Sequence, residues 1–138
     1  MNASAIALLG YATWTLVLLL AIAVLRTSLT VSGKRAANKF SPTGDDVSPF
    51  SGRLCRAHAN CYEFFPILAG ALGVALLTGN TAITDPLACW VLGARVVQST
   101  IHVASTSVNA VTARFVFFVI QVGVVAYWCL RLWGVALG

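Results

Sequence analysis

Apolar residues dominate four stretches of the chain, and polar residues gather between them. The first stretch, Ser4 to Leu25, runs for 22 residues without a charge and ends at Arg26. About 20 mainly apolar residues are enough for a helix to cross the hydrocarbon core of a bilayer. The pattern therefore predicts four membrane-spanning helices, at about residues 4–29, 53–77, 86–106 and 111–137.

The first apolar stretch also has to be weighed as a secretory signal peptide. No basic segment precedes it, its apolar run is longer than a signal peptide needs, and no small-residue cleavage site closes it. We therefore expect this stretch to remain in the protein as the first membrane helix.

The segment at about 31–52 is the long polar loop of this pattern, and its cations are Lys34, Arg35 and Lys39. Basic loops of membrane proteins lie mostly on the cytoplasmic side. This rule explains the cations more simply than phosphate binding by Lys34 and Arg35 does. We expect a cytoplasmic loop, with both chain ends on the other side of the membrane.

The composition agrees with the hydropathy pattern. Of 138 residues, 59% are hydrophobic and only 9% are charged, and the mean hydropathy is +0.86. Soluble domains carry about 25% charged residues, so we predict one all-α, multi-pass membrane domain at 1–138. The net charge of +5 does not indicate nucleic-acid binding, because the basic residues mark a loop and helix ends and form no patch among exposed aromatics.

Polar residues are densest where the second helix is expected to begin, from Arg53 to Pro66. If this segment is helical, Arg56, Asn60 and Glu63 are spaced i, i+4 and i+7 and share one face. Such side chains are unfavourable in lipid unless they have partners or a function. We interpret this face as one wall of a binding site.

A second polar face lies on the third helix. Arg95, Gln98 and His102 are spaced i, i+3 and i+7 in an otherwise apolar stretch. The fourth helix adds Arg114 about one turn from its cytoplasmic end and Gln121 two turns further on. Three helices therefore contribute polar side chains to the interior of the predicted bundle.

These side chains lie at similar depths if each helix rises about 1.5 Å per residue. Measured from the cytoplasmic side, Asn60 and Glu63 lie roughly 10 to 15 Å deep by that rise. Gln98 and His102 lie roughly 6 to 13 Å deep and Arg114 roughly 5 Å deep on the same scale. The agreement predicts one polar layer in the cytoplasmic half of the membrane.

Simpler explanations exist for the individual residues. Arg95 and Glu63 could form a buried ion pair that fixes helix packing, and for Arg95 we favour this structural role over ligand contact. Arg114 could reach lipid phosphates, and Gln98 and His102 could make only interhelical hydrogen bonds. Taken together, however, several cations, one carboxylate and the amides suit a small ligand with two carboxylates and an ammonium group.

The four cysteines give little support to metal or disulfide chemistry. They form no C-x-x-C pair, and Cys55 and Cys61 lie near the reducing cytoplasmic face. A metal site made of Cys55, His58 and Cys61 is disfavoured, because three-residue steps spread these side chains over more than one helix face. We expect no metal cofactor.

The start of the second helix resembles the signature of the MAPEG family, the membrane-associated proteins in eicosanoid and glutathione metabolism. The matching residues are Arg56-Ala57-His58, Asn60-Cys61 and Glu63-Phe64-Phe65-Pro66. The resemblance extends over the whole chain in length and topology, and this segment is its most specific part. Microsomal glutathione transferases belong to that family.

The resemblance implies a left-handed four-helix bundle that assembles as a homotrimer and binds glutathione between neighbouring subunits near the cytoplasmic face. It implies that Arg56, Asn60 and Glu63 hold the charged and amide groups of glutathione. Arg95 would match the arginine of the family's third helix. Arg114 would match the arginine of its fourth helix, which stabilises the glutathione thiolate.

The activity implied by the resemblance is that of a glutathione transferase or peroxidase acting on a lipophilic electrophile or lipid hydroperoxide. The alternative is a non-catalytic protein of the same fold that binds a membrane lipid or a partner. Gln98 and His102 stand where eicosanoid-specialised members carry tyrosines, and we include both among the glutathione-binding residues. The chain resembles the bacterial branch, which implies a bacterial inner-membrane protein and no eicosanoid substrate.

Overall fold

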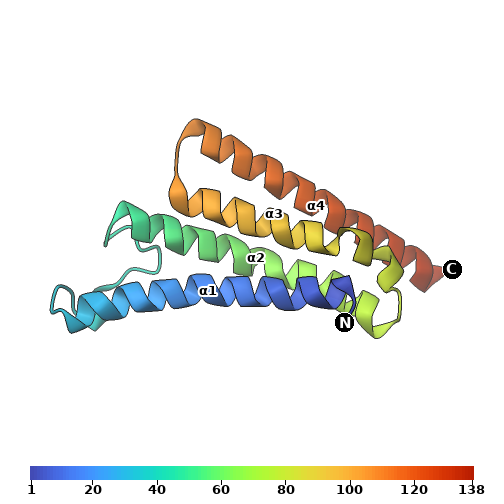
Figure 1. Cartoon of the computed structure of the whole chain (residues 1–138), viewed down its shortest axis with the longest axis horizontal. Coiled ribbons are helices and arrows are strands. Elements are labelled where there is room, and N and C mark those ends of the chain that lie inside the picture. The colour runs from blue at the N-terminus through green and yellow to red at the C-terminus, as the bar shows by residue number, and fades with distance from the viewer.

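Four long helices and two short 3-10 turns account for the regular structure in a computed structural model that describes all 138 residues (Figure 1). The long helices are α1 (Ala3–Val31), α2 (Pro49–Leu77), α3 (Asp85–Ala104) and α4 (Val108–Leu137). The turns are η1 (Ala37–Lys39) and η2 (Thr81–Ile83). The chain contains no strand, so the predicted all-α class is confirmed.

Each long helix is long and apolar enough to cross a membrane. The shortest, α3, has 20 residues, which corresponds to about 30 Å of helix at the usual rise. Many large apolar side chains lie on the outside of the bundle. Trp90 and Leu130, for example, have 77% and 73% of their surface exposed. An outward-facing apolar surface is what a bundle surrounded by lipid requires.

Two helices begin earlier than the apolar pattern predicts. The second begins at Pro49 instead of about residue 53, because the Ser48 side chain accepts a hydrogen bond from the Ser51 amide and proline is suited to the first helical turn. The fourth begins at Val108 instead of about residue 111, with Ser107 as its N-terminal cap. Polar capping residues, which hydropathy does not weigh, set both starts.

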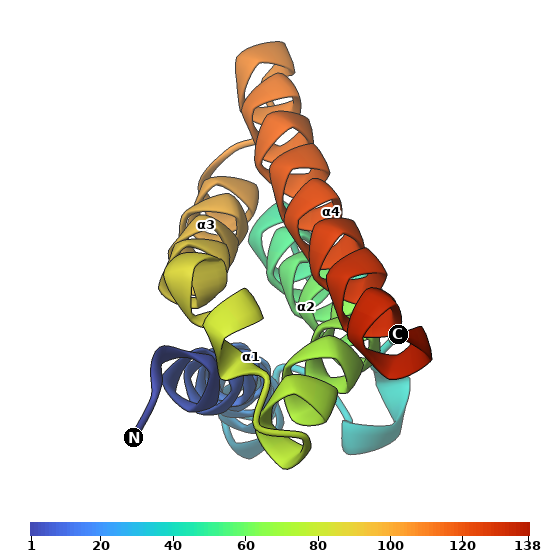
Figure 2. The same cartoon turned by 90° about the vertical axis from the view of Figure 1, so that its right-hand side faces the viewer.

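The helices run alternately up and down, so both termini lie at one end of the bundle and the long α1–α2 loop lies at the other (Figures 1 and 2). The short α3–α4 connection is also at the loop end. Helices α2 and α3 each pack against the three other long helices. Side chains near the start of α2, the end of α3 and the start of α4 therefore meet at the loop end.

Hydrogen bonds at several levels tie α1 to the rest of the bundle. At the terminal end, the backbone amide and hydroxyl of Ser4 donate to Asp85 Oδ1 at 2.8 and 2.5 Å. Closer to the loop end, the hydroxyl of the fully buried Tyr11 donates to the carbonyl oxygen of Cys61 at 3.0 Å. The second bond joins α1 to the helix that carries the polar segment.

Replacing Tyr11 with phenylalanine should lower the free energy of unfolding by about 1 kcal/mol, the usual contribution of one hydrogen bond. Thermal unfolding in a mild detergent measures the change. Tyr62→Phe is the matched control, because Tyr62 is exposed on α2 and its hydroxyl makes no hydrogen bond in the structure. Equal melting temperatures for the two variants would contradict the assigned role of the Tyr11 hydroxyl.

Candidate functional site

The three residues of the polar face predicted on α2 have different surroundings in the structure. Asn60 is half-buried against α3, whereas Arg56 and Glu63 are exposed on the surface of the single chain. Two clefts lie at the loop end of the bundle. Asn60 borders one of them, Arg56 borders the other, and Glu63 borders neither. Within one chain, the structure therefore brings two of the three predicted α2 residues to a common site.

Arg95 lies behind these clefts and is fully buried. Its Nη1 donates to the side-chain oxygen of Asn60 at 2.7 Å and to the Asn60 carbonyl at 3.3 Å. The guanidinium also lies over the rings of Phe64 and Tyr11, 4.8 and 5.5 Å from their centroids. Aromatic faces attract a cation, most strongly when it is desolvated.

The suggested ion pair between Arg95 and Glu63 is wrong. The chain has one ion pair, between Arg35 and Asp46 in the loop. Glu63 follows Asn60 by three residues and points to the exposed side of α2, whereas Asn60 faces Arg95. Arg95 is held instead by an amide, a carbonyl and two aromatic rings.

A cleft of about 230 Å³, here called the inner cleft, lies between α2, α3 and α4. Its polar lining is Asn60, Gln98, His102 and Arg114. Its apolar lining is Val111, Phe115 and Phe118. The structure thus brings polar residues from three helices to one cleft, and it adds an aromatic wall beside them.

A second cleft of about 340 Å³, here called the outer cleft, opens where the loop meets the helix ends. Its lining is mainly polar and charged. Its lining residues are Asp45, Pro49, Gly52, Arg53, Arg56, His102, Thr106 and Arg114. Three arginines and one aspartate give this cleft a net positive charge, which suits an anionic ligand.

His102 and Arg114 line both clefts, so the two clefts adjoin. Arg114 makes no hydrogen bond within the chain, and its Nη1 is buried without a partner. An unpartnered buried donor is unfavourable until an acceptor reaches it. The guanidinium of Arg114 is therefore available to a ligand at the junction of the clefts.

Two charged residues of the outer cleft, Asp45 and Arg53, are missing from the predicted site. Asp45 belongs to the loop, and hydropathy gives no indication that it folds back over the helix ends. Arg53 is predicted only as a charge flanking the loop, but its Nε donates to the Val103 carbonyl at 2.7 Å and so ties α2 to α3. The closeness of Asp45 in sequence to the basic residues at the start of α2 could have indicated that Asp45 lies beside them.

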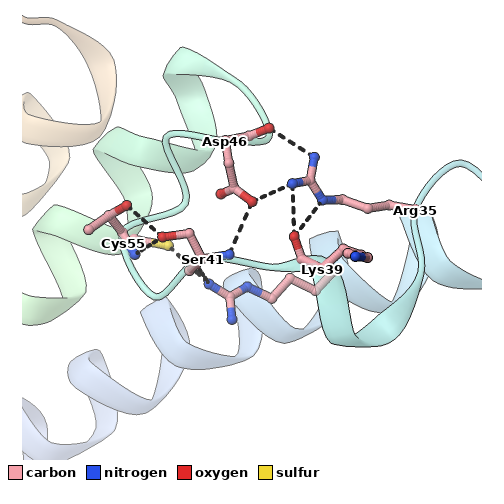
Figure 3. Close-up of polar contacts among 7 residues, drawn as sticks. Arg35, Lys39, Ser41, Asp46 and Cys55 are labelled. Atoms are coloured by element: carbon pink, nitrogen blue, oxygen red, sulfur yellow. Dashed lines mark hydrogen bonds and ion pairs between the residues drawn. The ribbon is translucent and has the colours of Figure 1, made fainter.

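The loop is fixed by two arginines that donate to its backbone, and Figure 3 labels one of them, Arg35. Arg35 donates to the Lys39 carbonyl, the Asp46 carbonyl and the Asp46 carboxylate. Arg26 Nη2, from α1, donates to the Ser41 carbonyl at 2.8 Å. These contacts hold the loop against the helix ends and explain why Asp45 has a defined place in the outer cleft.

Gly44 is one of the points where this loop packs closely against α2. Its φ of +72° is left-handed, and a Cβ there would lie 2.7 Å from Cys55 Sγ and 2.9 Å from the Ser51 carbonyl oxygen. The Ser51 carbonyl belongs to the helix backbone and cannot move away without distorting α2. The position thus requires glycine both for its conformation and for its space.

Gly44→Ala should lower the free energy of unfolding by about 1–3 kcal/mol more than Gly33→Ala, because only Gly44 adds overpacking to backbone strain. Gly33 has a similar φ of +70° with nothing within 4 Å of an added Cβ. Detergent-solubilised variants can be compared by thermal unfolding. Equal losses would show that the loop does not pack on α2 as described.

The arrangement favours anion binding over metal chemistry. No three His, Cys, Asp or Glu side chains are close enough together to hold a metal ion. The four cysteines are free thiols, and Cys55 and Cys61 are buried. What the clefts offer is arginine and amide donors beside an aromatic wall.

Fold and site together define a multi-pass membrane helix bundle with a cationic double cleft at its loop end. The MAPEG family model matches residues 4–134, nearly the whole chain. The protein therefore belongs to the MAPEG family, and the resemblance seen in the second-helix segment is confirmed. No curated protein and no solved structure matches the chain.

Proposed function

We propose that this protein is a glutathione-dependent transferase with peroxidase activity, which activates the glutathione thiolate for attack on a lipophilic electrophile or hydroperoxide. The observation that carries the proposal is the position of Arg114, whose unpartnered guanidinium stands where the polar outer cleft meets the partly aromatic inner cleft. A cosubstrate bound in one cleft and an apolar substrate in the other would meet at this residue.

The charges of the outer cleft fit the peptide part of glutathione. Arg53 and Arg56 supply cations for its two carboxylates, and Asp45 supplies an anion for its ammonium group. Asn60, Gln98 and His102, on the inner side, are placed to bind the cysteinyl portion. Within one chain, this assignment retains every predicted glutathione-binding residue except Arg95 and Glu63.

Arg95 and Glu63 have different parts in the proposal. Arg95 acts behind the site, because its guanidinium holds the side-chain oxygen of Asn60. Glu63 is exposed at membrane depth, where an unpaired carboxylate is unfavourable. We propose that a neighbouring subunit of a homotrimer covers Glu63 and brings it to a bound glutathione.

The chemistry follows from a cation beside the sulfur. Arg114 favours the charged form of the glutathione thiol, so a nucleophilic thiolate forms at neutral pH. Its attack on an electrophilic carbon forms a C–S bond, and the leaving group departs with the electron pair of the broken bond. Apolar substrates can enter from the lipid beside Phe115, which is 65% exposed.

With a hydroperoxide, the same thiolate attacks the terminal peroxide oxygen and the O–O bond breaks. The alkoxide that leaves takes up a proton and becomes an alcohol, while the sulfur becomes a sulfenic acid. A second glutathione thiol then reduces the sulfenic acid, giving the disulfide and water. We further propose that the loop is cytoplasmic, in a bacterial inner membrane, because basic loops lie mostly on the cytoplasmic side and glutathione is a cytoplasmic thiol.

Arg114→Ala should lower the rate of conjugation of an activated aryl chloride by about 10²–10³-fold, the usual effect of losing one group that stabilises the reacting anion. The ultraviolet absorbance of bound thiolate should fall in parallel. Arg131→Ala is the matched control, since Arg131 lies on the same helix, is exposed, and donates its hydrogen bond to Tyr127. Its rate should equal that of the wild type.

A wild-type protein that shows neither thiolate absorbance nor turnover of an aryl chloride or organic hydroperoxide would refute the proposal. If glutathione is retained equally by wild type and Arg114→Ala, and neither turns over, the protein is a non-catalytic binding protein of this fold. Equilibrium dialysis with glutathione separates these outcomes.

A further inference from the structure

Two amide side chains, Asn60 and Gln98, line the inner cleft. The oxygen of each accepts a hydrogen bond from a residue outside the cleft. Arg95 donates to Asn60 Oδ1 at 2.7 Å, and Gln121 Nε2 donates to Gln98 Oε1 at 2.9 Å. Arg95 and Gln121 are both fully buried. A buried donor therefore stands behind each amide of the cleft.

Chemistry fixes the orientation of Asn60. A guanidinium can only donate hydrogen bonds, so the side-chain oxygen of Asn60 must face Arg95. The amide nitrogen, Asn60 Nδ2, then points away from Arg95 and makes no hydrogen bond within the chain. Asn60 thus has a free donor and lines the inner cleft.

The orientation of Gln121 is fixed by the backbone of its own helix. Gln121 Nε2 donates to the Phe117 carbonyl at 2.9 Å, and a carbonyl oxygen can only accept. A flipped Gln121 would place its oxygen against that carbonyl. The same nitrogen also reaches Gln98, so Gln98 has to present its oxygen to Gln121. Gln98 Nε2 is left without a hydrogen bond inside the chain.

Packing does not account for Gln121. Its Oε1 is buried and has no hydrogen-bond partner, which is unfavourable by the desolvation of that oxygen. A methionine of similar length would fill the same space without that penalty. A glutamine with an unpartnered oxygen in the middle of an apolar helix indicates a role outside packing.

We propose that Gln121 is a positioning residue, which holds Gln98 with its Nε2 donor directed into the inner cleft beside Arg114. The cleft then presents donors from Gln98, Asn60 and Arg114 to a negatively charged ligand atom, and His102 is the other polar side chain of its lining. The inference rests on the proposed function, under which that atom is the glutathione sulfur. It assigns a role to a residue that contacts no ligand.

Two glutathione analogues test the role of Gln121 directly. Glutathione sulfonate carries a negative group at the sulfur position, whereas S-methylglutathione carries an uncharged thioether there. Gln121→Met removes the donor that orients Gln98. Binding of the sulfonate should weaken about tenfold or more, the usual effect of losing a hydrogen bond to a charged group, and binding of S-methylglutathione should stay within about twofold by the size of a surface substitution.

A double-mutant cycle shows whether Gln121 acts through Gln98. Gln98→Met alone should weaken sulfonate binding as much as Gln121→Met does, and the double variant should be no weaker than Gln98→Met. Thr100→Val is the control on α3, because Thr100 is exposed and its hydroxyl donates to Val96 of its own helix. It should bind both analogues like the wild type.

The outcomes separate this inference from the proposed function. Equal loss of both analogues by a folded Gln121→Met protein, or additive losses in the double variant, would overturn the positioning role while leaving glutathione binding intact. A wild-type protein that binds neither analogue overturns the proposed function and the positioning role with it. Selective loss of the sulfonate in both single variants supports the inference.

Discussion

The contact between Arg95 and Asn60 is the interaction on which the site depends. A cation buried in a membrane bundle is unfavourable unless its environment replaces water. Here Tyr11 of α1, Asn60 and Phe64 of α2 surround a guanidinium from α3. One side chain therefore joins three helices at the depth of the inner cleft and also sets the direction of an amide that lines it.

The polar groups around Arg95 are arranged in layers from the buried interior toward the two clefts. Buried donors lie deepest, amides come next, and the arginines at the two clefts are the outermost groups. At the loop end, Arg35 and Arg26 use their donors on backbone carbonyls, and Arg114 has no partner of its own. An unpartnered arginine donor is thus available at the junction of the two clefts.

Much of this architecture could be predicted from the sequence. Four uninterrupted apolar stretches are a strong signal for membrane helices, and helical spacing placed Asn60, Gln98 and His102 on faces that do meet. Depth along each helix also placed Arg114 correctly beside them. Periodicity is informative here because each helix has a single rise and repeat.

The partners of these residues could not be predicted in the same way. Opposite charges suggested that Glu63 would pair with Arg95, but in the structure Arg95 contacts Asn60 and Glu63 is exposed. The place of Asp45 depends on how a polar loop folds over the helix ends, which no periodic signal records. The coupling of Gln121 to Gln98 depends on hydrogen-bond direction, which residue spacing does not reveal.

Proton release on glutathione binding tests the central claim most directly. If Arg114 at the junction of the clefts stabilises a thiolate, binding of glutathione at neutral pH must release a proton, because the free thiol is mostly protonated there. Calorimetric titration of the purified protein in buffers of different ionisation enthalpy should show release of up to about one proton per bound glutathione. Binding without proton release, or no binding, would contradict the account.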